Sequence, residues 1–340
     1  MDSENAKRFF ENYTGKKSSE FITLAQSGSA RINFLAKAEK DYIVTYNENI
    51  QENESFFYFS EIFTQLGINT PIIFAISDDR KTYIQEFLGK NTLSDIITNE
   101  GLSQRVKDLV KQTLQKLYHL QTGTNGKIDY TKTFEYQSYD DLPVTHDLYY
   151  FKNFIADVLE LEYHKSTLLK EFKKIVYLIE SLEPKGLMIR DFQARNIMIN
   201  DQDEVSFIDY QSAMHGPLMY DVVSFLFQAK ANFPEDFKNE MIEFYIQLFD
   251  NEEVQHQLRN SIKPIQMMRF LQVLGAYGFR GLIQRKQHFI SSIEKGIDNI
   301  TQFAKSWENM KDYPELEKVI QQLALEQTQL KIDKILNIQA

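Results

Sequence analysis

Residues 187–211 read LMIRDFQARNIMINDQDEVSFIDYQ, and this stretch decides the fold. Asn196 follows Asp191 by five positions, and two short apolar runs on either side of a polar turn lead from Asn196 to Asp209. The pattern predicts a β-hairpin that returns Asp209 to the side of Asn196. Carboxylate and amide oxygens suit Mg²⁺, so Asn196 and Asp209 are candidate metal ligands. Asp191 is the candidate base that accepts a proton from an attacking hydroxyl, as phosphoryl transfer from ATP requires.

The same residues resemble the kinase signature H-R-D-x-x-x-x-N followed by D-F-G, with Ile189 in place of His. They are more similar still to the aminoglycoside and choline phosphotransferase superfamily, whose second motif is often I-D-[FY]-[QG], as in residues 208–211. The resemblance implies an α+β fold of the bilobal protein-kinase-like type. It places a small antiparallel-sheet N-terminal lobe at residues 1–88 and a large, mainly helical C-terminal lobe at residues 89–340.

Three strands are expected near the N-terminus, at residues 21–25, 31–36 and 42–46, with a turn of small residues between the first two. Backbone N–H groups in such a turn can approach phosphates. The resemblance makes Ser27, Gly28 and Ser29 the nucleotide-positioning loop. A plain hairpin turn is the alternative interpretation.

The third strand departs from the kinase pattern, because it lacks the lysine that pairs with the nucleotide phosphates. Arg31, Lys37 or Lys40 is a candidate to supply this charge, and the sequence does not choose among them. We include Arg31 among the nucleotide-binding candidates. Glu54, near the start of a helix predicted over residues 48–67, is a candidate acidic partner for that charge. An ordinary surface glutamate favoured by the helix dipole is the better interpretation of Glu54.

A second hairpin is expected over residues 71–87, and it ends at Gln85, Glu86 and Phe87. The resemblance implies that this end is the hinge whose backbone groups bind adenine. These three residues complete the nucleotide-binding candidates.

The rest of the chain has helical periodicity, broken by a loop predicted over residues 123–147. Gly275, Gly278 and Gly281 lie inside a helical stretch, which indicates close packing or a bend near a ligand. The predicted helices cover residues 93–97, 105–122, 149–163, 168–182, 235–303 and 316–338.

Residues 147–152, 189–196 and 267–281 look like one branch of the superfamily, the anomeric sugar kinases that act on N-acetylmuramate and N-acetylglucosamine. That resemblance implies ATP-dependent transfer of the γ-phosphoryl group to the anomeric hydroxyl of an N-acetylated amino sugar, with Mg²⁺. Arg195 is a candidate for stabilising the transferred phosphoryl group, or it pairs with Asp221 or another acid. A choline, homoserine or aminoglycoside kinase and a catalytically silent nucleotide-binding protein stay open as alternatives.

Composition bears on the kinds of partner and on the location of the protein. The chain has 340 residues, a net charge of −10 and no cysteine. The acidic balance argues against nucleic-acid or anionic-membrane binding, and no apolar stretch has the length of a membrane span. The N-terminus has no apolar segment typical of a secretory signal, so we expect a cytoplasmic protein with a small-molecule partner.

Overall fold

The computed structural model describes residues 2–25, 30–228 and 230–337, which form two compact units. Unit 1 consists of Met1–Gln137 and Leu187–Met214, and unit 2 consists of Ser138–Gly186 and His215–Ala340. The division predicted at residues 88 and 89 falls inside unit 1. Unit 1 therefore combines the whole of the predicted N-terminal lobe with the central stretch.

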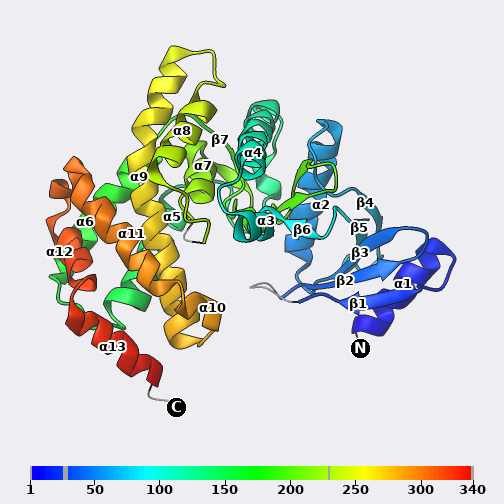
Figure 1. Ribbon diagram of the computed structural model, residues 1–340, viewed down its shortest axis with the longest axis horizontal. Coiled ribbons are helices and arrows are strands. Elements are labelled where there is room, and N and C mark those ends of the chain that lie inside the picture. The colour runs from blue at the N-terminus through cyan, green and yellow to red at the C-terminus, as the bar shows by residue number, and fades with distance from the viewer. Residues whose placement is uncertain (1, 26–29, 229, 338–340) are drawn as a thin grey trace. The chain divides into compact units, whose positions relative to one another are not determined.

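Unit 1 begins with a helix against an antiparallel sheet of five strands in the order β1-β2-β3-β5-β4 (Figure 1). Side chains alternate between the two faces of a strand, so Phe34, Val44 and Ile84 reach the face that packs on Phe10 of α1. The intervening residues of these strands are left to the opposite face. The elements are α1 (Asp2–Thr14), β1 (Glu20–Thr23), β2 (Ile32–Lys37), β3 (Asp41–Tyr46), β4 (Ile73–Ile76) and β5 (Thr82–Glu86).

Helix α2 (Ile50–Gln65) follows β3 and begins where the side chain of Asn49 accepts a hydrogen bond from the backbone N–H of Glu52. Phe56, Phe59 and Phe63 are buried at helical spacing, as predicted. Gly67 has a positive φ of 68°, which suits a residue just beyond a helix end. The sequence thus sets both ends of α2 and its buried face.

The remainder of unit 1 includes a three-stranded antiparallel sheet in the order β6-β8-β9. Its strands β8 and β9 are the hairpin predicted from the central stretch. The elements are β6 (Asn91–Thr92), α3 (Leu93–Glu100), α4 (Gln104–Gly123), η1 (Tyr130–Lys132), η3 (Ala194–Asn196), β8 (Ile197–Ile199) and β9 (Val205–Phe207). Strands β7 (Lys185–Met188) and β10 (Met214–Pro217) each contain a point where the chain passes from one unit to the other.

Unit 2 is mainly helical, which together with the sheets of unit 1 confirms the α+β class. Its elements are α5 (Asp141–Phe151), η2 (Lys152–Ala156), α6 (Lys165–Glu180), α7 (Met219–Leu226), α8 (Glu235–Ile246), α9 (Glu252–Tyr277), η4 (Gly278–Ile283), α10 (Gln287–Ile290), α11 (Ile293–Ser306), η5 (Glu308–Asp312), α12 (Pro314–Leu323) and α13 (Glu326–Asn337). Among the helices that the structure describes, none combines the length and apolar character needed to cross a bilayer.

Several predictions in unit 2 are wrong, including the unbroken helical stretch over residues 235–303, which is divided among α8, α9, η4, α10 and α11. The loop expected up to residue 147 ends early, because the Asp140 side chain accepts a hydrogen bond from the backbone N–H of Leu142 and starts α5 at Asp141. The helix expected over residues 316–338 is two helices, α12 and α13. Local capping by a single aspartate therefore outweighs the loop-like composition that precedes α5.

The glycines of α9 and η4 permit close packing of backbone on backbone, as predicted. A Cβ atom on Gly275 would lie 2.7 Å from the backbone N of Phe151, and one on Gly278 would lie 2.2 Å from the carbonyl O of Phe154. Both contacts are to the α5–η2 segment, which indicates that these two glycines set the distance between the two helical segments.

We predict that Gly278→Ala destabilises the protein by about 1–3 kcal/mol, because the added methyl group has no room beside the Phe154 carbonyl. Gly123→Ala is the matched control, since a Cβ there meets nothing within 4 Å and alanine favours a helix. Urea unfolding followed by circular dichroism measures both. Equal unfolding midpoints for the two variants would contradict the packing argument.

Candidate nucleotide and metal site

The β8–β9 hairpin brings Asn196 and Asp209 together. The backbone N–H of Ile208 donates to the carbonyl O of Asn196 at 3.1 Å, which closes the hairpin. The Asn196 side-chain amide then donates to Asp209 Oδ2 at 3.2 Å. The predicted adjacency of these two residues is confirmed, and it follows from two strands of equal length joined by a polar turn.

Asp191 lies just before the hairpin in a sharp bend. Its backbone N–H donates to the carbonyl O of Ile189 at 3.0 Å, across Arg190 with a φ of 73°. Asp209 also has a positive φ, of 65°. Left-handed backbone is rare for residues with a Cβ atom and is often found at functional sites. The two aspartates of the motif are thus held by backbone geometry that residues outside such sites seldom adopt.

The Asp191 carboxylate is held at both of its oxygens. The Gln193 amide donates to Oδ1 at 2.6 Å, and the Arg195 guanidinium donates to Oδ2 at 2.8 Å. The Asn196 amide donates to the backbone carbonyl of Asp191 at 2.9 Å. These contacts fix the orientation of Asp191 and place a positive charge beside it, so the acid that pairs with Arg195 is Asp191.

Arg31 is the cation that lies against Asp209. Its guanidinium donates to Asp209 Oδ1 and to the Gln211 side-chain oxygen, the latter at 3.2 Å, and its Nε lies 3.3 Å from Glu52 Oε1. The Arg31 and Glu52 side chains are 14% and 15% exposed. An ion pair with so little access to water is screened much less than one on the surface. Arg31 therefore ties α2 to the Asp209 segment.

Two further hydrogen bonds tie α2 to this segment. The Ser55 hydroxyl donates to the backbone carbonyl of Gln211 at 2.7 Å, and the hydroxyls of Ser60 and Tyr210 lie 2.7 Å apart. The four residues that form these two hydrogen bonds are uncharged and buried. The position of Glu52 relative to Asp209 is consequently set by packed contacts along the helix.

The charges around Asp209 act on its ionisation. Burial raises the pKa of the Asp209 carboxyl, but the Arg31 guanidinium and the Gln211 amide outweigh that effect and hold its pKa below the ordinary value of 3.8. For Arg31, burial lowers the pKa and the neighbouring Asp209 carboxylate raises it, with a net shift upward. Both groups therefore carry their charges at neutral pH.

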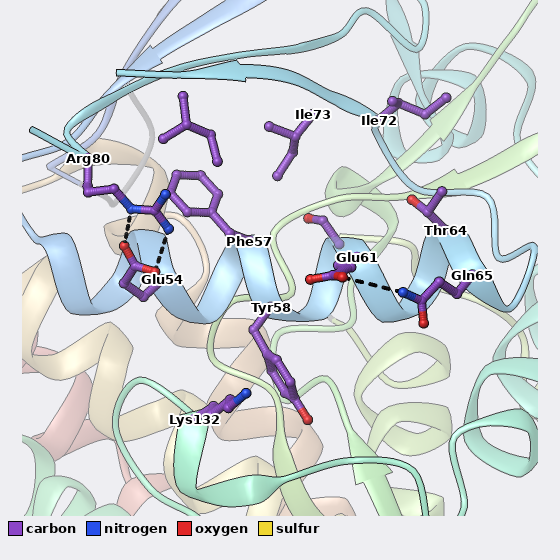
Figure 2. Close-up of a pocket in the computed structure, with 12 residues that line it drawn as sticks. Glu54, Phe57, Tyr58, Glu61, Thr64, Gln65, Ile72, Ile73, Arg80 and Lys132 are labelled. Atoms are coloured by element: carbon purple, nitrogen blue, oxygen red, sulfur yellow. Dashed lines mark hydrogen bonds and ion pairs between the residues drawn. The ribbon is translucent and has the colours of Figure 1, made fainter. Parts of the chain in front are cut away.

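Lys37 and Lys40, the other candidates to replace the strand lysine, and Glu54, the candidate acidic partner, make their contacts away from Asp209. Lys37 pairs with Glu20 at 2.6 Å, and the Lys40 ammonium lies over the Phe74 ring. Glu54 forms a two-pronged ion pair with Arg80, at 2.5 and 2.6 Å (Figure 2). The interpretation of Glu54 as an ordinary surface acid is confirmed.

Strand β3, which lacks a lysine, carries a neutral polar side chain near its end. Thr45 lies on the same face of β3 as Ile43, two residues earlier. Its hydroxyl donates to the Asn33 side-chain oxygen at 2.7 Å and accepts from the Gln85 amide at 3.0 Å. Arg31, just before β2, thus supplies a charge that β3 does not.

A cavity of about 530 Å³ in unit 1 is bordered by most of the predicted site residues. Its apolar walls include Leu35, Ile43 and Met198, which suit the faces of an aromatic ring. The predicted residues that line it are Arg31, Gln85, Glu86, Phe87, Arg195, Asn196 and Asp209. Asp191 borders this group through its hydrogen bonds to Arg195 and Asn196.

Gly89 also lines the cavity and requires its glycine. Its φ is 114°, and a Cβ there would lie 3.2 Å from the carbonyl O of Ile199. The predicted loop residues Ser27, Gly28 and Ser29 lie outside the residues that the structure describes.

Sequence reasoning missed Glu52 and Gln211. A signal for Glu52 was available, because it shares a helical face with Ser55, Phe56 and Phe59, whereas Glu54 does not. Gln211 carries no such signal, since its contact with Arg31 joins residues 180 positions apart.

The donor set fits a divalent cation of the magnesium type. Asn196 and Asp209 offer amide and carboxylate oxygens, the hard ligands that Mg²⁺ takes in small number when phosphates and water complete its shell. Asn196 is buried and its amide nitrogen is already engaged with Asp191 and Asp209, which fixes the rotation of that amide.

Comparison with protein families gives one match that spans most of the chain. Residues 22–258 match the model of the phosphotransferase enzyme family. A curated relative, an N-acetylmuramate/N-acetylglucosamine kinase of Pseudomonas aeruginosa, is 27% identical over 173 residues. The match covers 50% of this chain and 47% of the relative, so the chain spans about half the length of that protein.

Solved structures show the same fold. An ethanolamine kinase of Plasmodium vivax is 17% identical, with a TM-score of 0.61 over 84% of this chain and 82% of its own. The choline kinase LicA of Streptococcus pneumoniae is 12% identical, with a TM-score of 0.60 over 88% and 99%. An aminoglycoside phosphotransferase solved with ADP and hygromycin B is 14% identical, with a TM-score of 0.59 over 89% and 98%. The expected kinase-like fold is confirmed.

We predict that Arg31→Met, studied without metal or nucleotide, lowers the free energy of unfolding by about 1–3 kcal/mol at pH 7, because charge-assisted hydrogen bonds are lost. A folded-state pKa below 3.8 means that the Asp209 carboxylate stabilises the fold above that value and ceases to do so as the pH falls through its lowered pKa. The difference between wild type and Arg31→Met should therefore be largest near neutrality and shrink below about pH 4. Urea unfolding at pH 3 to 7 checks this, and a difference that grows in acid would contradict it.

Proposed function

The chain belongs to the phosphotransferase enzyme family, and from this premise we propose that it is an ATP-dependent small-molecule kinase that transfers the γ-phosphoryl group to a hydroxyl. The observation that carries the proposal is the convergence of Asp191, Asn196 and Asp209 beside a cavity that Arg31 also lines. Two carboxylates and an amide in this arrangement are the parts that phosphoryl transfer to a hydroxyl needs.

In the proposed reaction Asp191 accepts the proton of the acceptor hydroxyl as its oxygen attacks the γ-phosphorus. The hydrogen bonds from Gln193 and Arg195 hold the carboxylate in one orientation. A positioned base of this kind gives about 10²–10⁴-fold in rate, or about 3–5 kcal/mol at 1.36 kcal/mol per decade. Arg195 lines the cavity and is half exposed, so we propose that it also contacts the transferred phosphoryl group.

Asn196 and Asp209 are the residues that would hold Mg²⁺, which supplies charge neutralisation and alignment of the phosphates when bound. Gln85, Glu86 and Phe87 border the apolar part of the cavity and are proposed to receive the adenine through their backbone groups. Ser27, Gly28 and Ser29 are proposed to contact the phosphates through their backbone N–H groups.

We propose that Arg31 is the phosphate-binding cation in place of a strand lysine, and that Glu52 positions it. The guanidinium has five donors in a fixed fork, so it can keep its contact with Glu52 while other donors turn to phosphate oxygens. A lysine at this place would have a single ammonium to share among the same acceptors.

The favoured acceptor is the anomeric hydroxyl of an N-acetylated amino sugar. Support comes from the curated relative that acts on N-acetylmuramate and N-acetylglucosamine, at 27% identity over half of the chain. Choline, homoserine and aminoglycoside acceptors stay as alternatives, as does a protein that binds nucleotide without turnover. We propose the cytoplasm, where ATP is available, as the location.

The direct test is ATP consumption with Mg²⁺ over a panel of N-acetylglucosamine, N-acetylmuramate, choline, ethanolamine, homoserine and aminoglycosides. We expect turnover with the N-acetyl sugars and a phosphate on the anomeric oxygen, identified by ³¹P NMR. Turnover only with an amino alcohol or an aminoglycoside would refute the sugar assignment.

Asp191→Asn is the control for this assay. It should reduce turnover by about 10²–10⁴-fold, since the proton acceptor is removed together with the charge that pairs with Arg195. Nucleotide affinity should stay within about threefold, because the metal and adenine residues are unchanged. Near-wild-type phosphotransfer by this variant would show that Asp191 is not the base. No ATP consumption by the wild-type protein with any acceptor would favour the silent nucleotide-binding alternative.

The proposed role of Glu52 has a matched control two residues away on the same helix. Glu52→Gln should raise the KM for ATP about tenfold, because the ion pair that positions Arg31 is lost. A tenfold change corresponds to about 1.4 kcal/mol of binding free energy. Glu54→Gln breaks only the exposed pair with Arg80 and should leave the KM unchanged. Steady-state kinetics with varied ATP measures the KM of both variants. Equal KM values would contradict the role of Glu52 in positioning Arg31.

A further inference from the structure

Unit 2 contains a cavity of about 690 Å³ that none of the proposed catalytic, metal or nucleotide residues lines. It lies among the end of α7, the start of α8 and the sides of α9 and α11. Its volume is in the range of sites for small molecules. Every residue that borders it belongs to unit 2, so it is a separate site from the nucleotide cavity of unit 1.

The charge of this cavity is opposite to that of the chain. Lys238 of α8, Lys263 of α9 and Lys295 of α11 line it, and Glu235 is the one acid among the described lining residues, whereas the chain as a whole carries −10. Glu235 pairs with Lys238. Within the residues that the structure describes, no ion pair engages Lys263 or Lys295. Two ammonium groups from different helices are therefore available to an anion.

The α8 helix adds to this positive field. It is 12 residues long, and its first turn, after Pro234, borders the cavity. No side chain caps that end, so the partial positive charge of the helix N-terminus falls on the same space as the lysines. Glu235 and Asp236 in the first turn offset part of this field, so the lysines stay the main source of positive charge.

The uncharged lining is rich in hydrogen-bonding groups. Amide side chains and one hydroxyl border the cavity: Gln228, Asn232, Asn239, Asn299, Gln302 and Ser306. Gln266 is a further lining residue, 4% exposed, and its Oε1 receives no hydrogen bond from the described residues. If the Gln266 amide rotates toward the cavity, its Oε1 can accept a hydrogen bond from a ligand hydroxyl. The lining thus suits a molecule with several hydroxyl groups.

Aromatic rings form the apolar part of the lining. Phe227, Phe233, Phe270 and Phe303 border the cavity. The Phe227 ring lies 4.6 Å from the Lys238 ammonium, and the Phe303 ring lies 5.5 Å from that of Lys263. The C–H face of a sugar ring packs well on an aromatic face, while its hydroxyls point outward to amides.

We propose that this cavity binds a small phosphorylated sugar. The lysines meet the phosphate, the amides meet the hydroxyls, and the phenylalanines meet the ring. An inorganic anion would use only the first group of contacts, and a neutral sugar only the other two. The proposal does not depend on the kinase activity, because binding is measured without turnover.

The test is isothermal titration of the full chain with N-acetylglucosamine 1-phosphate, glucose 6-phosphate, N-acetylglucosamine and inorganic phosphate. We expect saturable binding of at least one sugar phosphate, at least tenfold tighter than inorganic phosphate or the neutral sugar. The double variant Lys263→Gln, Lys295→Gln should weaken that binding at least tenfold. The matched control is Lys305→Gln, Lys311→Gln, which changes two exposed lysines of α11 and η5 that do not line the cavity.

The remaining outcomes overturn the proposal. Equal affinity of the wild type for inorganic phosphate and sugar phosphate would leave an anion site only, and equal affinity for the neutral sugar would remove the role of the phosphate. Binding unchanged in Lys263→Gln, Lys295→Gln but lost in Asp209→Ala would assign it to the nucleotide site. The single variants Lys263→Gln and Lys295→Gln replace the double variant if it unfolds.

Discussion

The site of unit 1 is held together by the hydrogen-bond donors that neutralise one carboxylate, that of Asp209. A partly buried negative charge is costly unless donors surround it. Asp209 receives hydrogen bonds from Arg31, just before β2, from Asn196, at the end of η3, and from Gln211 of its own loop. These donors come from parts of the chain up to 178 residues apart. The same contacts that neutralise the carboxylate therefore join the five-stranded sheet to the β8–β9 hairpin inside unit 1.

The positive charge beside Asp209 comes from Arg31, and strand β3 contains no lysine. Thr45, near the end of β3, forms hydrogen bonds to the neutral side chains of Asn33 and Gln85. The guanidinium of Arg31 enters from the start of β2 and reaches Glu52 and Asp209 at once. A planar fork with several donors can bridge two acids in this manner, whereas an ammonium group offers no fixed geometry. Glu52 of α2 is the fixed partner of this charge.

The parts of this site that the sequence predicted are those that short-range pattern determines. Two apolar runs around a polar turn define the β8–β9 hairpin, and the hairpin alone places Asn196 beside Asp209. The left-handed backbone at Arg190 could not be predicted from the sequence, because arginine has no preference for a positive φ. The choice of Arg31 over Lys37 and Lys40 depends on the path of the sheet, which composition does not encode. The aromatic, proline-containing sequence around the start of α5 predicts a loop, whereas the capping side chain of Asp140 starts a helix there.

The same reasoning explains why the acceptor is harder to infer than the chemistry. Phosphoryl transfer is catalysed by alignment and charge at the transferred group, and these residues contact parts that every acceptor hydroxyl shares. Selection among acceptors comes from groups that recognise the rest of the molecule and take no part in the bond exchange. Asp191, Asn196 and Asp209 are thus silent about whether a sugar or an amino alcohol is phosphorylated. Groups that recognise an acceptor can therefore differ between kinases that share this bond exchange.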